Sequence, residues 1–213
     1  MNSRNPDRIV RYAAGTRINH WIVAISFVLA ALSGLALFHP ALFWLTNLFG
    51  GGPWTRILHP FIGCVMVAAF YLLCVHFWRD NLMQQRDWIW LRKINDVVGN
   101  REENLPDVGR YNAGQKLLFF TLVVCLITLL LSGILIWRVY FSAFFPIGVI
   151  RAGALLHAFF AFVLISSIIV HIYAGIWVKG SIRAMTRGWV TPGWAWKHHR
   201  AWFREVNKGI HSK

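Results

Sequence analysis

Four long apolar runs set the first limit on what this sequence can fold into. They lie at about residues 17–38, 55–78, 115–137 and 151–178. A hydrocarbon core about 30 Å thick is crossed by about 20 helical residues, so each run is long enough to span a bilayer. Backbone groups in lipid must be hydrogen-bonded within the span, which favours helices. The sequence therefore predicts an all-α integral membrane four-helix bundle, a single domain over residues 1–213, and it shows no internal repeat.

The basic residues divide unequally between the two sides of this predicted bundle. Of 22 Lys and Arg, nineteen lie before or at the start of the first run, in the 79–116 loop or after the fourth run, and the other three are Arg56, Arg138 and Arg151. By the positive-inside rule, both termini and the 79–116 loop face the cytoplasm. A net charge of +14 indicates nucleic-acid binding only where basic residues form a stripe on a soluble surface. Membrane lipids are therefore expected partners, and nucleic acid is not.

Histidines in the apolar runs are the strongest functional signal. Six of the nine lie in these runs or at their ends: His20, His39, His59, His76, His157 and His171. An imidazole in hydrocarbon is costly without a partner, so each is a candidate site residue. His157 and His171 are 14 residues apart, which places both on one side of a helix and about 21 Å apart along its axis. Two stacked haems need ligands spaced in this way, whereas zinc and copper sites need three or four ligands at one level.

The predicted topology gives each ring a depth in the membrane. The first run goes outward, so His20 is near the cytoplasmic face, and the second returns, so His59 is near the outer face. The fourth run also goes inward, which places His157 at the outer level and His171 at the inner level. Depth therefore pairs His59 with His157, and His20 with His171. Two further histidines, one at each depth, remain competitors on this argument: His39 and His76. The chain has no C-x-x-C-H motif, so a haem would be held without thioether links.

Several short segments, in order along almost the whole chain, resemble one known family. They are Ile9-Val10-Arg11-Tyr12, Arg17-Ile18-Asn19-His20-Trp21, Arg56-Ile57-Leu58-His59-Pro60, Gly109-Arg110-Tyr111-Asn112-Ala113-Gly114-Gln115-Lys116, Leu156-His157, His171-Ile172-Tyr173-Ala174, Trp177-Val178-Lys179-Gly180 and Trp196-Lys197-His198-His199. The chain is similar to the gamma subunit, cytochrome b556, of respiratory membrane-bound formate dehydrogenase. The resemblance implies a di-haem cytochrome b in the bacterial cytoplasmic (inner) membrane.

The resemblance also implies the haem ligands. The outer haem b would be held by His59 and His157, and the inner haem b by His20 and His171. These are the same four rings that depth and helix phase pair. The family's ligand pattern does not include the two competitors, His39 and His76.

A quinone site is the second implication of the resemblance. It would lie beside the inner haem and involve Asn112, Gly114 and Gln115, at the cytoplasmic start of the third span. A quinone carbonyl accepts hydrogen bonds, which an amide side chain can donate in a partly apolar site. The alternative is that Asn112 and Gln115 only cap the third helix. The residues taken alone favour capping.

The implied function is that of an electron-transfer subunit of a formate:quinone oxidoreductase. Electrons would enter from an iron–sulfur beta subunit on the periplasmic side, cross through two haems b and reduce menaquinone or ubiquinone. A separate molybdenum or tungsten alpha subunit would oxidise formate, so this chain would hold a quinone-reducing site and no formate-oxidising site. The resemblance further implies a trimer of heterotrimers. The alternatives are the cytochrome b subunit of a membrane-bound nickel–iron hydrogenase, and a haem-free membrane anchor or metal transporter.

Overall fold

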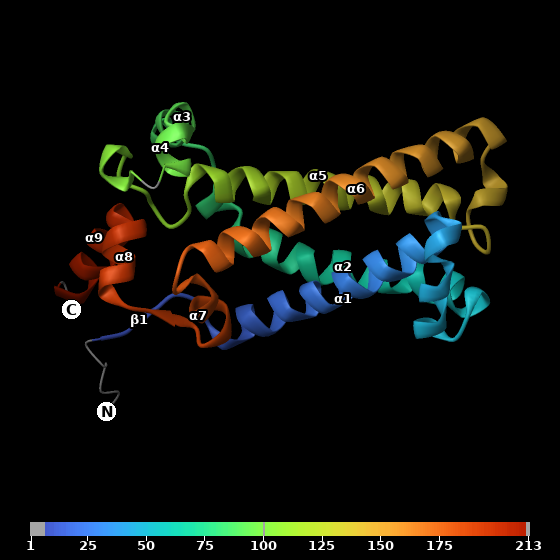
Figure 1. Cartoon of the computed structure of the whole chain (residues 1–213), viewed down its shortest axis with the longest axis horizontal. Coiled ribbons are helices and arrows are strands. Elements are labelled where there is room, and N and C mark those ends of the chain that lie inside the picture. The colour runs from blue at the N-terminus through green and yellow to red at the C-terminus, as the bar shows by residue number, and fades with distance from the viewer. Residues whose placement is uncertain (1–6, 100, 212–213) are drawn as a thin grey trace. The chain divides into compact units, whose positions relative to one another are not determined.

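Four long helices form the frame of the chain. The computed structural model describes residues 7–99 and 101–211, so Arg4 and Lys213 of the charge count lie outside the described residues. Within it, α1 (Ala14–Phe38), α2 (Gly52–Phe77), α5 (Ala113–Ile136) and α6 (Ile147–Trp177) are each long and apolar enough to cross a membrane (Figure 1). The predicted all-α fold with four spans is confirmed.

The helices extend beyond the predicted spans at one end. Each ends at the predicted residue or one residue before it, but begins two to four residues earlier. Hydropathy marks only the part of a helix that lipid must surround, whereas polar residues at headgroup depth can also be helical. The residues that precede the predicted spans are uncharged, 14–16 in α1 and 147–150 in α6, and the helices continue through Arg17 and Arg151, at which those spans begin.

Short elements connect and flank the long helices. They are β1 (Ile9–Val10), η1 (Pro40–Phe49), η2 (Arg79–Asn81), α3 (Gln85–Arg92), α4 (Ile94–Val98), η3 (Glu102–Asn104), η4 (Ser142–Phe144), α7 (Ser181–Thr186), β2 (Trp189–Val190), α8 (Pro192–His198) and α9 (Arg200–His211). The chain divides into two compact units. The first, here called the core unit, comprises Ile18–Val75 and Thr121–His171, and the second, the terminal unit, comprises Met1–Arg17, His76–Phe120 and Ile172–Lys213.

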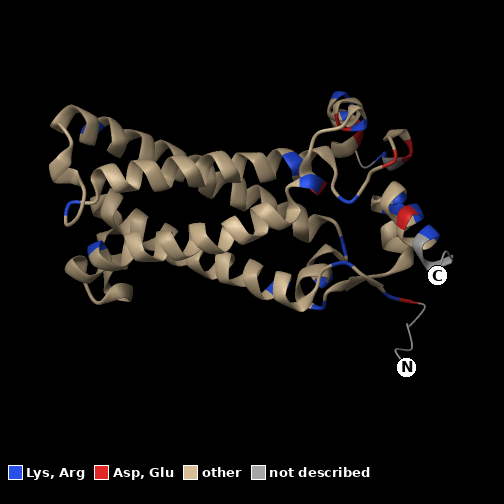
Figure 2. Cartoon of the chain, turned by 180° about the vertical axis from the view of Figure 1, so that it is seen from behind, with Lys and Arg blue, Asp and Glu red and all other residues tan. Residues whose placement is uncertain are grey.

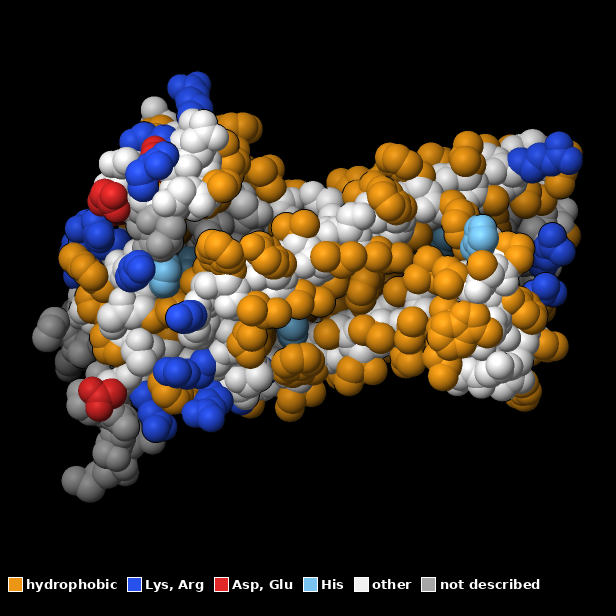
Figure 3. Space-filling model, viewed as in Figure 1, with side chains coloured by type: hydrophobic (Ala, Val, Ile, Leu, Met, Phe, Trp, Pro, Cys, Tyr) orange, Lys and Arg blue, Asp and Glu red, His pale blue; other side chains and the backbone are white. Residues whose placement is uncertain are grey.

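The core unit consists of the apolar lengths of the four long helices and the two loops η1 and η4. Its sequence contains three arginines and no Asp or Glu, and the long helices are almost free of charge in Figure 2. Its interior is a cluster of buried apolar side chains: Ala30, Met66, Phe70, Cys125, Leu126 and Leu164. Many large apolar side chains on these helices are exposed, among them Leu155 at 74% and Phe162 at 69%, and Figure 3 shows hydrophobic side chains over the helical surface. Such a surface is stable in lipid and unfavourable in water.

The terminal unit brings together the two ends of the described chain. Strands β1 and β2 pair antiparallel, with Ile9 opposite Val190 and Val10 opposite Trp189. Four spanning helices lie between these strands in sequence, and an even number of crossings returns the chain to the side from which it started. The pairing therefore agrees with the prediction that both ends of the chain lie on one side of the membrane.

Arg11 is the polar centre of the terminal unit. Only 4% of it is exposed, and its guanidinium lies 4.2 Å from the centre of the Trp202 ring. It donates a hydrogen bond to the carbonyl of Arg110, whose side chain donates to the Arg11 carbonyl. Burial lowers the pKa of Arg11. Burial is also the main reason why the pKa of the nearby Tyr111 lies well above its ordinary value. The cation thus ties the N-terminal segment, the 110 loop and α9 to one another.

Candidate functional site

Two pairs of histidine rings face each other in the core unit. The ring centres of His59 and His157 are 6.2 Å apart, with an angle of 70° between their planes. Those of His20 and His171 are 6.4 Å apart, with an angle of 53°. Three of these rings are half-buried and that of His171 is exposed. The structure thus brings together the two pairs that depth and helix phase selected.

The separation within each pair suits a metal bound from both sides. Metal–nitrogen bonds of about 2.0 Å to two opposed imidazoles place the ring centres about 6.2 Å apart. Both observed distances, 6.2 and 6.4 Å, agree with this value. Among the described residues, no group of three or more His, Cys, Asp or Glu side chains is placed to hold a metal ion. The arrangement therefore fits two-ligand sites such as those of haem, and not tetrahedral zinc or copper sites.

The two pairs lie at different levels of the helices. On α6, His157 and His171 are 14 residues apart, which corresponds to about 21 Å along the axis. On α1, His20 belongs to one pair, while Ser33, 13 residues further along, contacts His59 of the other pair. Both helices thus give the same spacing, which supports two separate sites stacked across the membrane.

The rings of His59 and His157, the pair predicted to lie at the outer level, each rest against a serine and a glycine of a neighbouring helix. Ser33 Oγ lies 2.9 Å from His59 Nδ1, and Ser132 Oγ lies 3.0 Å from His157 Nδ1. A Cβ on the adjacent Gly34 would come within 3.1 Å of His59 Cε1, and one on Gly133 within 3.4 Å of His157 Cε1. A side chain on Gly34 would therefore press on the His59 ring, whereas one on Gly133 would just reach van der Waals contact with the His157 ring.

The other small residues of the helices have different surroundings. A Cβ on Gly153 would meet Leu135 Cβ at 3.1 Å, so this glycine permits close packing of α5 and α6. Gly63 and Gly175 would meet no atom within 4 Å among the described residues. Of these five glycines, only Gly34 and Gly133 therefore lie against a histidine of the candidate site.

The two competing histidines have local roles. His39 is the N-cap of η1, and its Nδ1 accepts a hydrogen bond from the backbone N–H of Ala41 at 3.2 Å. The His76 ring packs edge-on against Phe77, with ring centres 4.5 Å apart. Both rings are exposed. The geometry thus gives each of them a structural explanation.

The segment predicted to bind quinone forms the start of α5. Asn112 Oδ1 accepts from the backbone N–H of Gln115 at 2.8 Å, and Gln115 Oε1 accepts from that of Asn112 at 2.9 Å. This reciprocal arrangement is a capping box, so both side chains cap the start of α5. Both amide oxygens are used in the cap, whereas the amide NH2 groups take no part in these two bonds. A Cβ on Gly114 would lie 3.4 Å from Trp90 and 3.5 Å from Asn112 Oδ1, both ordinary van der Waals distances.

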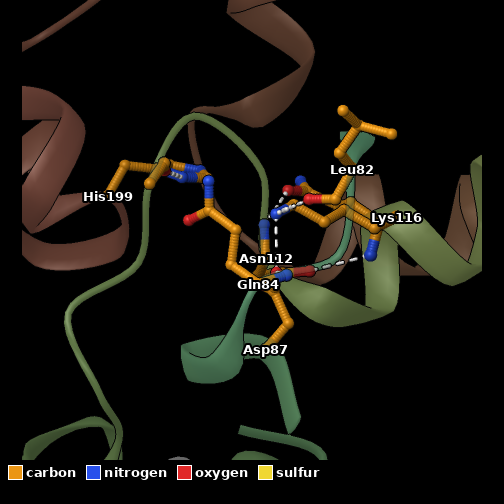
Figure 4. A network of polar contacts seen from close by, with 8 residues as sticks. Leu82, Gln84, Asp87, Asn112, Lys116 and His199 are labelled. Atoms are coloured by element: carbon orange, nitrogen blue, oxygen red, sulfur yellow. Dashed lines mark hydrogen bonds and ion pairs between the residues drawn. The ribbon is translucent and has the colours of Figure 1, made fainter. Parts of the chain in front are cut away.

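A buried ion pair anchors the same turn of α5. Lys116 Nζ donates to Asp87 Oδ2 at 2.7 Å and to the Leu82 carbonyl at 2.9 Å, as Figure 4 shows. Asp87 Oδ2 also accepts from the backbone N–H of Gln84 at 2.7 Å. The two charged side chains are only 4% and 5% exposed. The pair joins α3 to the residue that directly follows the capping box.

The contacts of the outer histidines were not predicted from the sequence, although a signal was present. Leu32-Ser33-Gly34 precedes Leu58-His59, and Leu131-Ser132-Gly133 precedes Leu156-His157. The serine-to-histidine spacing is 26 residues in the first case and 25 in the second. The α1–α2 and α5–α6 helix pairs thus place a serine against a histidine in the same way.

Comparison with known proteins agrees with this geometry. Residues 11–188 match the family described as prokaryotic cytochrome b561. The chain is 49% identical over 207 residues to the formate dehydrogenase cytochrome b556(fdo) subunit of Escherichia coli K12, covering 97% of both chains. It is 44% identical to the formate dehydrogenase cytochrome b556 subunit of Haemophilus influenzae, covering 94% of this chain and 84% of the relative. It is also 44% identical to the nitrate-inducible formate dehydrogenase cytochrome b556(Fdn) subunit of E. coli K12, covering 94% and 92%. The chain therefore belongs to the prokaryotic cytochrome b561 family, a family of haem b proteins with membrane-spanning helices, and within it to the formate dehydrogenase cytochrome b556 subunits.

Proposed function

We propose that this chain is the membrane-anchoring di-haem cytochrome b subunit of a formate dehydrogenase complex, and that it passes electrons across the bacterial inner membrane to quinone. The observation that carries the proposal is the presence of two facing histidine pairs, with ring centres 6.2 and 6.4 Å apart, at two levels of one helical core. The assignment to a formate dehydrogenase complex rests on the names of the similar proteins.

The four histidines are proposed as axial ligands. His59 and His157 would hold the outer haem b, and His20 and His171 the inner one. A haem at each level would supply one-electron transfer, and the conversion of one quinone to a quinol would take two electrons and two protons from the cytoplasm. The apolar helices exclude water and ions from this path. Each electron moved inward works against the membrane potential and would store about 2.3 kcal/mol of free energy per 100 mV.

Quinone binding is proposed for the start of α5, at Asn112, Gly114 and Gln115. The cap uses the two amide oxygens and leaves two NH2 donors for a quinone carbonyl of menaquinone or ubiquinone. Two isosteric variants separate the two roles. Asn112→Asp and Gln115→Glu keep the oxygen that caps the helix but remove the NH2 donor. We expect both to raise the KM for quinone while the helix start stays intact by hydrogen exchange, and an unchanged KM in both would refute this part of the proposal.

The partners are proposed from the relatives and from the topology. Electrons would come from an iron–sulfur beta subunit at the periplasmic face, and an alpha subunit with molybdenum or tungsten would oxidise formate. The complex would assemble as a trimer of heterotrimers, with membrane lipids around it and both termini of this chain in the cytoplasm. Purification of the native complex and identification of its large subunit tests this assignment, because a nickel–iron protein would indicate a hydrogenase instead.

The ligand assignment is tested by haem counting. His171→Ala should reduce the haem content of the purified complex from two to one by pyridine haemochrome assay and abolish quinone reduction, while the partner can still reduce the outer haem. His76→Ala is the matched control, because this ring has the predicted depth of His171 but packs against Phe77. Two haems in His171→Ala would show that the pairing is wrong, and a colourless wild-type complex would refute the whole proposal.

A further inference from the structure

The two outer histidines have the same surroundings on two different helix pairs. Ser33 of α1 lies against His59 of α2, and Ser132 of α5 lies against His157 of α6, at 2.9 and 3.0 Å. Both serines are almost completely buried, at 0% and 3% exposure. Two independent helix pairs thus place a hydroxyl on the same nitrogen, Nδ1, of each ring.

The direction of these hydrogen bonds follows from the serines' other contacts. Ser33 Oγ lies 2.7 Å from the carbonyl of Leu29, and Ser132 Oγ lies 2.6 Å from that of Thr128. A carbonyl can only accept, so each hydroxyl uses its single hydrogen there and offers a lone pair to the imidazole. Each ring nitrogen must therefore be the donor.

A second carbonyl lies near each hydroxyl and supports the same conclusion for both rings. Ser33 Oγ lies 3.1 Å from the backbone carbonyl of Ala30, and Ser132 Oγ lies 3.4 Å from that of Leu129, so the hydroxyl hydrogen has an acceptor on its own helix. In each case the carbonyl belongs to the residue three positions before the serine. Nδ1 therefore carries the hydrogen, which leaves the lone pair on Nε2, the nitrogen that would bind iron.

His20 of the inner pair differs from both outer rings at this nitrogen. The Nδ1 of His20 is buried and has no hydrogen-bond partner among the residues that the structure describes. An acceptor on Nδ1–H makes an imidazole a stronger electron donor and stabilises the oxidised metal, which lowers the reduction potential. The surroundings of the outer rings therefore favour a lower potential at the outer level than at the inner level.

We propose that Ser33 and Ser132 are positioning residues that hold the outer histidines in the Nδ1–H form and keep the outer haem at a lower potential than the inner one, so that electrons run inward. The inference rests on the proposed ligand assignment. It assigns a role to two side chains that bind neither iron nor quinone. The two hydroxyls act only through the rings that they orient.

Alanine variants of the two serines test the inference in the purified complex. Ser33→Ala and Ser132→Ala each remove one acceptor, and the double variant removes both while the backbone carbonyls remain. Ser167→Ala is the matched control, because Ser167 Oγ also donates to a carbonyl one turn earlier, that of Val163 at 2.8 Å, and forms no hydrogen bond with the four histidines among the residues that the structure describes. The readouts are haem content by pyridine haemochrome and the midpoint potentials of both haems by redox titration of the α-band.

The double variant should keep two haems and shift the electron equilibrium between them about tenfold toward the outer haem, a rise of about 59 mV in its midpoint potential. Each single variant should give a smaller shift in the same direction, and the inner haem and Ser167→Ala should keep wild-type values. Loss of the outer haem in the double variant but not in the control also supports the positioning role. Unchanged potentials with two haems, or equal haem loss in the control, would overturn it.

The same series keeps the two proposals distinguishable. His59→Ala should remove the outer haem, because it removes a ligand. If His59→Ala retains two haems, the ligand assignment fails and the inference fails with it. If His59→Ala loses one haem and the double serine variant has wild-type potentials, only the role of the serines is refuted.

Discussion

Removal of the charge on Asp87 should loosen the start of α5. Asp87 and Lys116 are 4–5% exposed, and the shortest contact between them is 2.7 Å. Asp87→Asn keeps the shape of the side chain but leaves the ammonium of Lys116 buried without a counter-charge. Loss of one partner of a buried ion pair costs about 3 to 5 kcal/mol. At about 1.4 kcal/mol per factor of ten, the open state of this turn should become about a hundred to a few thousand times more populated.

The effect should be confined to the segment that the ion pair joins. Lys116 directly follows Gln115, so the capping box, with the amide groups that we propose to bind quinone, loses its anchor. Hydrogen–deuterium exchange of the complex in lipid nanodiscs should show faster exchange in residues 112–116 and in α3, together with a higher KM for quinone. Haem content should remain at the wild-type value.

Two further variants sharpen this test. Asp96→Asn breaks an ion pair with Arg101 at 2.8 Å in the same loop, but its side chains are 23% and 53% exposed, so we expect little change. Replacing both members of the buried pair, Asp87→Leu with Lys116→Met, removes both charges and should recover most of the protection. Equal exchange in Asp87→Asn and Asp96→Asn would refute the reasoning, because burial would then not determine the cost.

Two other predictions follow from individual side chains. Gly34→Ala should reduce binding of the proposed outer haem, because the new Cβ would lie 3.1 Å from His59 Cε1. Gly63→Ala should be tolerated, because its Cβ would meet no described atom within 4 Å. The haem content of the two variants checks this prediction, and equal haem content would contradict it. Burial, with a smaller effect of Arg11, lowers the pKa of His199 to about 3, so the unfolded chain takes up a proton below about pH 6.5 where the folded chain does not. Stability is therefore lost as the pH falls from about 6.5 toward 3, by about 2 kcal/mol at pH 5. His199→Asn keeps a donor but does not titrate, so hydrogen exchange in α8 and α9 should become less sensitive to pH, and an unaltered sensitivity would count against this origin.

The helices and the histidine pairs could be predicted because they depend on local patterns. The length of an apolar run determines whether it can span a bilayer, and a separation of 14 residues fixes the relative direction of His157 and His171 on one helix. The positive charge of the loops then shows which end of each helix faces the cytoplasm, and this gives each histidine its predicted depth. None of these steps requires knowledge of how one helix is rotated against the next.

The remaining parts of the site depend on contacts between distant residues. Ser33 reaches His59 only because α1 and α2 pack with particular faces together, and hydropathy does not specify those faces. Arg11 was counted as one of the cytoplasmic charges, but the structure buries it against Trp202. A two-residue strand such as β1 has no periodicity that could indicate a partner about 180 residues away.

The pairing of β1 with β2 can form only after most of the chain has been synthesised. A ribosome adds about 5 to 20 residues per second, so Ile9 waits roughly 9 to 36 s for Val190 to be made. All four long helices have left the ribosome's catalytic centre by then, because α6 ends at Trp177. A nascent chain that stalls before β2 leaves β1 as an unpaired strand edge, which a protease or chaperone can distinguish from the finished protein.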